Sequence, residues 1–198
     1  MIRRTALLAA ALCCALAASA SALAAEVEVE GFKFPDSAAV NGQNTVLNGA
    51  GVSSILSTKS TAVAFYLPHK QTTMEAACTE KGAKRIQFYM LRDVSARDLS
   101  NAMLDRIRQN AAEEFATNIL QTAQLGVVFG NRAKVLKGDL VTVDYNPANQ
   151  TTEFNLNGQK IGDTIKGESF FPMMMKVWIG PKVRGSTRDA LLGVSAAR

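Results

Sequence analysis

The chain has 198 residues, with 22 basic and 17 acidic side chains, one histidine and three cysteines. The positive charges are interspersed rather than clustered, so the sequence gives little support to nucleic-acid binding. One histidine is too few for a histidine-based zinc site, and the sequence contains no P-loop, dinucleotide-binding, EF-hand or H-E-x-x-H spacing. We therefore expect neither a metal nor a cofactor.

The first 24 residues have the pattern of a cleavable signal peptide. Arg3 and Arg4 form a short positive region, residues 7–16 form an apolar run, and Ala22-Leu23-Ala24 is a small-x-small cleavage site. The run is shorter than the roughly 18 residues of a membrane-spanning helix, which disfavours a transmembrane anchor. We expect cleavage before Ala25, export of the chain, and a single folded domain over residues 25–198.

Cleavage would also remove Cys13 and Cys14. A lipoprotein anchored through either cysteine is disfavoured, because neither follows the usual Leu-x-small pattern. The remaining chain would keep one cysteine, Cys78, and a net charge of +3 from 20 basic and 17 acidic residues. Such a chain cannot form an internal disulfide and offers no cysteine-based metal site.

Strand patterns dominate the first half of the predicted domain. Period-two alternation, or β-branched and aromatic content, predicts strands over residues 26–34, 40–47, 61–67 and 85–91. Asn41-Gly42 and Asn48-Gly49 are typical turn signals at the ends of the second of these strands. Residues 74–80 are predicted to form one or two helical turns.

Helical patterns follow, and strands then return. Ser95 and Asp98 resemble an N-cap with an acidic residue in the first turn. The apolar side chains after them recur at helical spacing, at Leu99, Met103, Leu104 and Ile107, and helical composition continues to residue 125. Strands are predicted over residues 140–145 and 151–156, with Asn157-Gly158 as a turn, and helices over residues 170–179 and 186–192. This order predicts an α+β fold in which helices cover one face of an antiparallel sheet.

Four features have both a structural and a functional interpretation. His69 is predicted to be an exposed loop residue, and Cys78 a buried small hydrophobe rather than a reactive thiol. Asp93 could cap the helix that follows while Arg92 pairs with a carboxylate. The apolar run over residues 170–175, with three consecutive methionines, predicts either a fully buried helix or a pliable wall of an apolar pocket.

Seven short blocks give the sequence a family resemblance. They are Leu47-Asn48-Gly49-Ala50-Gly51-Val52, Ala64-Phe65-Tyr66-Leu67-Pro68, Leu91-Arg92-Asp93-Val94-Ser95, Lys137-Gly138-Asp139, Asn157-Gly158, Val177-Trp178-Ile179-Gly180 and Leu191-Leu192-Gly193. In this order they resemble the bacterial chalcone isomerase-like proteins, over about residues 38–194. The resemblance implies an open-faced β-sandwich, in which a large antiparallel sheet is backed by a layer of helices with an apolar cleft between them.

The resemblance also identifies five positions that carry catalysis in plant chalcone isomerases. They are an arginine after the Gly-x-Gly-Val turn, a threonine, a tyrosine, an asparagine and a polar residue on the last cleft helix, and they correspond here to Ser53, Thr61, Leu99, Arg106 and Val177. At most Thr61 matches. Without a cation at position 53, chalcone cyclisation would lose its main electrostatic stabilisation, so this activity is not expected.

Three hypotheses for function remain. The first is an exported, non-catalytic protein of the periplasm that binds a small apolar or amphipathic ligand such as a fatty acid. The cleft residues expected to contact it are Ser53, Thr61, Leu99, Met103, Arg106, Met174 and Val177. The second is an isomerase- or lyase-type enzyme of changed specificity, with Thr61 and Arg92 as catalytic candidates, Tyr66 or Tyr89 orienting the substrate and Arg106 as a second source of charge. The third is an envelope interaction or scaffold protein, which a packed cleft would favour, whereas an open apolar cleft would favour ligand binding.

Overall fold

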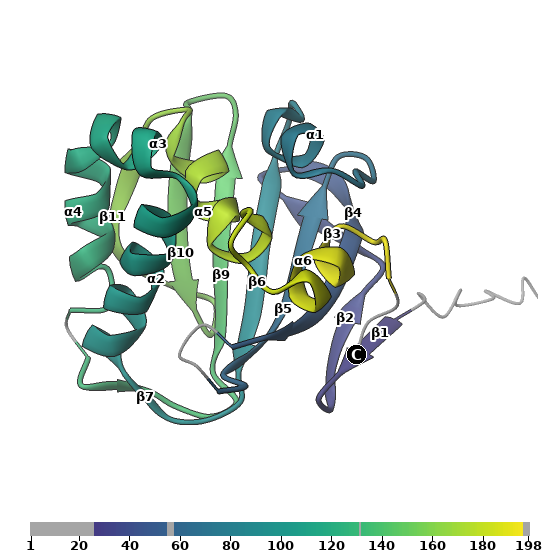
Figure 1. Ribbon diagram of the computed structural model, residues 1–198, viewed down its shortest axis with the longest axis horizontal. Helices are drawn as coiled ribbons and strands as arrows, with labels where there is room; N and C mark the ends of the chain where they lie inside the picture. Colours follow the sequence, from purple (N-terminus) through teal and green to yellow (C-terminus); the bar gives the residue numbers. More distant parts are fainter. Residues whose placement is uncertain (1–25, 55–57, 131, 196–198) are drawn as a thin grey trace, which may run out of the picture.

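A seven-stranded, fully antiparallel sheet runs through the middle of the molecule (Figure 1). Its strands, in spatial order, are β11 (Gln159–Lys166), β10 (Thr151–Leu156), β9 (Leu140–Asn146), β6 (Lys84–Met90), β5 (Thr61–Leu67), β4 (Gln43–Ser53) and β3 (Ser37–Val40). The computed structural model describes residues 26–54, 58–130 and 132–195, so the predicted signal peptide lies outside the described residues.

Helices cover one face of this sheet, as the sequence predicts for an α+β fold (Figure 1). They are α1 (Met74–Thr79), α2 (Ala96–Asn110), α3 (Ala112–Thr117), α4 (Ile119–Val127), α5 (Phe170–Ile179) and α6 (Gly185–Leu191). A hairpin of β1 (Glu26–Val29) and β2 (Phe32–Pro35) packs on the other face. A short pair, β7 (Val94–Ser95) and β8 (Lys134–Val135), completes the described elements.

Strand β5 is buried along its whole length, because both faces of the sheet are covered there. Val63, Phe65 and Leu67 belong to the core on the helix side. Their alternating neighbours belong to the smaller core under the β1–β2 hairpin, where Tyr66 is fully buried. This explains why residues 61–67 form a continuous apolar run, and the predicted bounds of this strand are confirmed.

The predicted strand over residues 26–34 is wrong in one respect, because it is a hairpin. Glu30 and Gly31 adopt φ angles of 50° and 82° and reverse the chain between β1 and β2. Two consecutive residues with positive φ are typical of a tight hairpin turn. The sequence pattern does not predict this turn, because glutamate, unlike asparagine, seldom adopts a positive φ.

Two of the three predicted asparagine-glycine turns are confirmed, at Asn41-Gly42 and Asn157-Gly158. The third prediction is wrong, because Asn48-Gly49 lies inside β4, where the pairing register shifts. The buried Asn48 amide donates to the carbonyls of Gln71 and Leu191 at 3.0 and 2.8 Å. Its Oδ1 accepts from the backbone N–H of Gln71 at 2.6 Å. This dipeptide therefore fastens α6 to the sheet instead of turning the chain.

The helical predictions hold with local corrections. Ser95 caps α2, since its hydroxyl accepts from the N–H of Asp98 at 3.0 Å. Asp93 does not cap that helix, because its carboxylate accepts from the N–H of Lys137 at 2.9 Å. The helical stretch after residue 111 is divided into α3 and α4 at Asn118. Arg92 is exposed, and among the described residues no carboxylate pairs with it.

Helix α5 is the buried helix that its methionine-rich sequence predicts. Eight of its ten residues are buried. Trp178 packs edge-on against Phe65 of β5, with ring centroids 6.3 Å apart, and lies 5.6 Å from the ring of Phe88 on β6. Each such aromatic contact contributes about 1 kcal/mol beyond the burial of its area. Helix α5 therefore fills the space between the sheet and the outer helices.

Gly49→Ala should destabilise the fold, because a Cβ at this position would lie 2.1 Å from the carbonyl oxygen of Ala190 in α6. Relieving that overlap requires α6 to move away from β4, so we expect a loss of about 2–3 kcal/mol in the free energy of unfolding, measured in urea. Gly126→Ala is the matched control, because its Cβ would have only ordinary contact with Leu104 at 3.6 Å. In α4 this control should be neutral or gain up to about 1 kcal/mol. Equal unfolding free energies for the two variants would contradict the close approach of α6 to β4 at Gly49.

Candidate functional site

The apolar residues expected to line a cleft lie in the helix-side core. Leu99 and Met103 of α2, and Met174 and Val177 of α5, each expose 1% or less of their surface. None of them lines any of the three cavities described among residues 26–54, 58–130 and 132–195. The space between α2, α5 and the sheet is therefore packed at these four residues.

Ser53 and Thr61 face each other across β4 and β5, at one end of the sheet. They expose 3% and 1% of their surface. Thr61 alternates with Val63 and Phe65, so its side chain points to the helix side. Its hydroxyl finds no hydrogen-bond partner among the described residues. An unpaired buried hydroxyl costs about 1–3 kcal/mol. Thr152 Oγ1 and Trp178 Nε1 are likewise buried without a partner among the described residues.

Arg106 brings a positive charge to this end of the sheet from α2. Its Nη2 donates to the carbonyl oxygen of Ser54 at 3.0 Å. Burial, with a further contribution from the nearby Arg184, lowers the pKa of Arg106. The Arg106 guanidinium thus lies beside the residue that follows Ser53 and is held there by a backbone carbonyl.

The structure does not bring the other catalytic candidates to Thr61. Tyr66 points to the hairpin side of the sheet, where its hydroxyl donates to the carbonyl of Pro35 at 3.0 Å and burial raises its pKa. Tyr89 lies on that same side and stacks on Phe32, with ring centroids 4.4 Å apart. Arg92 is exposed beyond the end of β6. These side chains therefore do not form one site with the Thr61 hydroxyl.

The largest cavity described is an open groove of about 800 Å³ at the opposite end of β6. This end is where β6 begins at Lys84, whereas Thr61 pairs with Met90 at its other end. The groove lies among α1, the N-terminal half of α5, the end of β9 and the hairpin that follows it. Its lining residues are Met74, Glu75, Cys78, Thr79, Glu80, Lys81, Gly82, Lys84, Glu114, Tyr145, Pro147, Gln150, Glu168, Ser169, Pro172 and Lys176. No pattern in the sequence singled out this groove.

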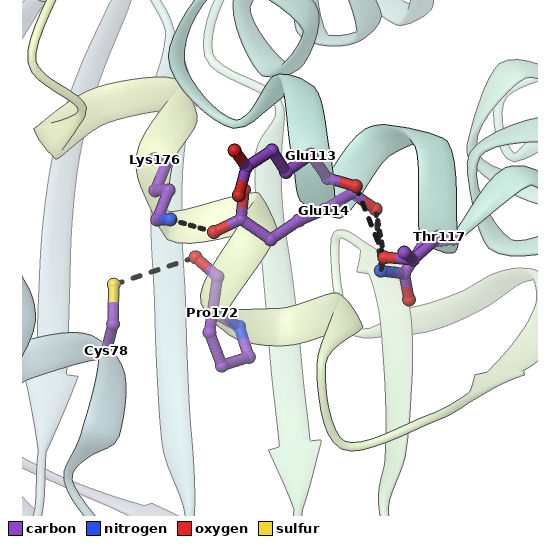
Figure 2. Close-up of polar contacts among 7 residues, drawn as sticks. Cys78, Glu113, Glu114, Thr117, Pro172 and Lys176 are labelled. Carbon is purple, nitrogen blue, oxygen red and sulfur yellow. Dashed lines mark hydrogen bonds and ion pairs between the residues drawn. The ribbon is translucent and has the colours of Figure 1, made fainter.

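The wall of the groove beside α5 combines a thiol with an ion pair (Figure 2). Lys176 of α5 pairs with the carboxylate of Glu114 from α3. The Sγ of Cys78, on α1, lies 3.7 Å from the carbonyl oxygen of Pro172. Cys78 is partly buried, and burial raises the pKa of its thiol, which keeps it protonated and weakly nucleophilic.

Comparisons with known proteins assign this fold to a family. The sequence model described as chalcone isomerase-like matches residues 25–193. The chain belongs to the chalcone isomerase-like family. The crystal structure of the Arabidopsis thaliana fatty-acid binding protein AtFAP1 is similar to this chain with a TM-score of 0.58 and 15% sequence identity, covering 82% of this chain and 92% of that one. No curated protein matches the sequence.

For this chalcone isomerase-like chain, the family and fold predictions are confirmed, and the identity to AtFAP1 is low enough that the likeness shows the fold alone. His69 is exposed, as predicted for a loop residue, and its Nδ1 lies 2.7 Å from a carboxylate oxygen of Glu80. Within the described ranges, no cluster of three or more metal-ligating side chains occurs. None of the helices described is both long and apolar enough to cross a bilayer.

Lys84 is a buried cation at the base of the groove, exposing 2% of its surface. Its ammonium group donates to the carbonyl oxygens of Ala77 and Cys78 at 3.2 and 2.9 Å. These are carbonyls of the last turn of α1, so Lys84 caps the helix that carries the groove's thiol. Burial lowers the pKa of Lys84 to about 8.

The stability of the protein should therefore depend on pH through Lys84. Unfolded, this lysine keeps its proton up to about pH 10, whereas the folded protein releases it near pH 8. Between these values the unfolded state binds more protons, so stability rises with pH. The difference in unfolding free energy between wild type and Lys84→Met should grow by about 2–3 kcal/mol from pH 7 to pH 10.

Subtracting the unfolding free energy of Lys84→Met from that of the wild type cancels the contributions of all the other titrating groups, which the two proteins share. Lys81→Met, at an exposed lysine of the loop between α1 and β6, controls for the loss of a positive charge. Urea unfolding at several pH values measures both differences. A wild-type minus Lys84→Met difference that stays flat from pH 7 to pH 10 would show that Lys84 is not desolvated in the folded protein.

Proposed function

We propose that this protein binds a small amphipathic molecule, such as a fatty acid, without catalysis, in the groove between α1, α5 and the β9–β10 hairpin. The observation that carries the proposal is the groove itself. Its volume of about 800 Å³ lies within the range of roughly 300–1,000 Å³ typical of small-molecule sites. Of the residues first expected to hold the ligand, Leu99, Met103, Met174 and Val177 are buried in the helix-side core and line none of the described cavities, so the groove is the better candidate.

The lining of the groove suits a ligand with an apolar body and an anionic head. Met74, Pro172 and the ring of Tyr145 offer apolar surface. Three lysines line the groove: Lys84 donates to backbone carbonyls, Lys176 pairs with Glu114, and Lys81 lies 3.0 Å from Glu168. A ligand carboxylate would compete with Glu114 or Glu168 for its lysine, because the displaced glutamate keeps its own negative charge in the groove lining.

Two further observations support a binding role over chemistry. At least four of the five positions that carry catalysis in plant chalcone isomerases differ here, and Ser53 stands where the arginine is expected. AtFAP1, a protein of the same fold, is a fatty-acid binding protein. By analogy, this fold can bind a fatty acid.

We further propose that the protein is exported and works in the periplasm. The support is the pattern of the first 24 residues, with its positive start, apolar run and Ala22-Leu23-Ala24 site. Intact mass of the protein recovered from the periplasmic fraction of a bacterial host should correspond to a chain that begins at Ala25. A mass that retains residues 1–24, or a protein found only in the cytoplasm, would contradict export.

Ligand binding is tested by fluorescence titration with a fluorescent fatty acid, using protein purified without added lipid. Cys78→Trp places a large side chain in the groove and should lower the affinity about tenfold or more. Thr72→Trp adds the same side chain at an exposed position outside the groove lining and should bind like the wild type. Equal affinities in the two variants would show that the fatty acid, if bound, lies elsewhere.

A chemical footprint gives an independent measure of occupancy. Cys78 is the only cysteine after residue 24, so alkylation of the processed protein reports on one thiol in the groove wall. A saturating fatty acid should slow this alkylation several-fold. An unchanged alkylation rate in the presence of bound ligand would contradict occupancy of the groove.

A further inference from the structure

The outer side of α4 is an unpartnered apolar surface. Among the described residues the large hydrophobic side chains that are exposed are Ile119 (64%), Leu120 (78%), Val127 (69%), Leu136 (50%) and Val194 (61%). Three of these five belong to α4, and we call Ile119, Leu120 and Val127 the α4 face. The outward side of a helix on a globular protein is normally polar or charged. Here the whole stretch from Phe115 to Asn131 contains no charged residue.

Positive charges surround this face. Arg132 lies five residues beyond the end of α4, and its N–H donates to the carbonyl of Phe129 at 3.0 Å. Lys160 of β11 lies with Arg132 around a small cavity beside Val128, and Lys166 is held next to α4 because its carbonyl accepts from Gln121 at 3.1 Å. Lys134 and Lys137 come next along the chain, and both are exposed.

Negative charge is sparse around the α4 face. The sequence has no carboxylate from Phe115 to Gly138. On the neighbouring strand β11 the one carboxylate is Asp163, and Glu153 of β10 is occupied by Lys160 at 2.8 Å. Glu113 and Glu114 of α3 precede α4, so the surplus of positive charge lies on the side of α4 that faces β11.

We propose that the α4 face docks this protein on a membrane surface that contains anionic lipids. Exposed aliphatic side chains with a basic rim are the combination that binds at the interface of a bilayer, where the apolar groups enter the headgroup region and the cations pair with lipid phosphates. The proposal concerns attachment to the surface and does not rest on the ligand groove.

Two other occupants fit the observations less well. A second copy packed by two-fold symmetry would bring Arg132 and Lys166 of both chains to the same interface, where like charges repel. The chain's own N-terminal segment enters the fold at β1, on the opposite side of the molecule from α4 (Figure 1). An anionic lipid surface can accommodate the apolar side chains of the α4 face and also pair with the nearby cations.

Docking through α4 would also bring the groove close to the lipid. Asn118, which begins α4, accepts a hydrogen bond from the hydroxyl of Ser169 at 2.8 Å, and Ser169 lines the groove. The neighbouring Glu114 of α3 lines it as well. Direct contacts therefore join the start of α4, which carries the α4 face, to the wall of the groove formed by α3 and α5.

Co-sedimentation with vesicles tests the proposal, using phosphatidylcholine alone and phosphatidylcholine mixed with phosphatidylglycerol. Each protein is expressed from the full sequence. Its intact mass is measured first, to establish whether residues 1–24 have been removed. The wild type should bind the anionic vesicles, more weakly as salt is added. Leu120→Glu with Val127→Glu should abolish this binding. Val194→Glu is the matched control, because Val194 is 61% exposed but lies outside α4, and it should bind as the wild type does.

The basic rim has its own variant. Arg132→Gln with Lys166→Gln should weaken binding to anionic vesicles about fivefold for each cation removed. Circular dichroism confirms the fold of each variant. Absence of vesicle binding by the wild type, binding that Leu120→Glu with Val127→Glu leaves unchanged, or a dimer in light scattering that the same pair abolishes would each overturn the proposal. Cys78→Trp, which fills the groove, should still bind vesicles as the wild type does. Vesicle binding is therefore tested independently of ligand binding in the groove.

Discussion

The packing of α5 against the centre of the sheet is the interaction on which the rest of this structure depends. Trp178 lies against Phe65 of β5 and Phe88 of β6, and eight of the ten residues of α5 are buried. A helix that is apolar on all sides must be covered on all sides, so α2 lies along one side of it and α1 and α6 along others. The order of the helix layer follows from this one buried element.

The same packing decides where a ligand could bind. In a chalcone isomerase-like fold the space between sheet and helices is the expected cleft, but here Leu99, Met103, Met174 and Val177 fill it. The largest described opening lies beside α5, where Pro172 and Lys176 line a groove together with α1 and the α3 carboxylate of Glu114. The family's fold is thus kept, while four positions expected to line its cleft are buried and the largest described groove lies at the opposite end of β6 from Thr61.

Local patterns in the sequence were sufficient for much of the fold. The apolar run of β5, the Ser95 cap and the buried character of α5 were predicted, because each depends on residues adjacent in the chain. Glu30-Gly31 and Asn48-Gly49 were misjudged, because the first turn uses an unusual residue and the second is fixed by α6, far away in the sequence. The groove was missed for a similar reason. The groove brings together Met74, Tyr145 and Lys176, which are far apart in the sequence, so no local pattern predicts it.

The central proposal for this protein is that a small amphipathic ligand occupies the groove rather than the packed core. Titration with a fatty acid, followed by the backbone amide resonances of isotope-labelled protein, tests this most directly. We expect the largest shifts at Cys78, Lys81 and Ser169, which line the groove, and small ones at Thr61, Leu99 and Val177. Shifts concentrated at Thr61, Leu99 and Val177 would show that the core opens to admit the ligand, and would contradict the claim.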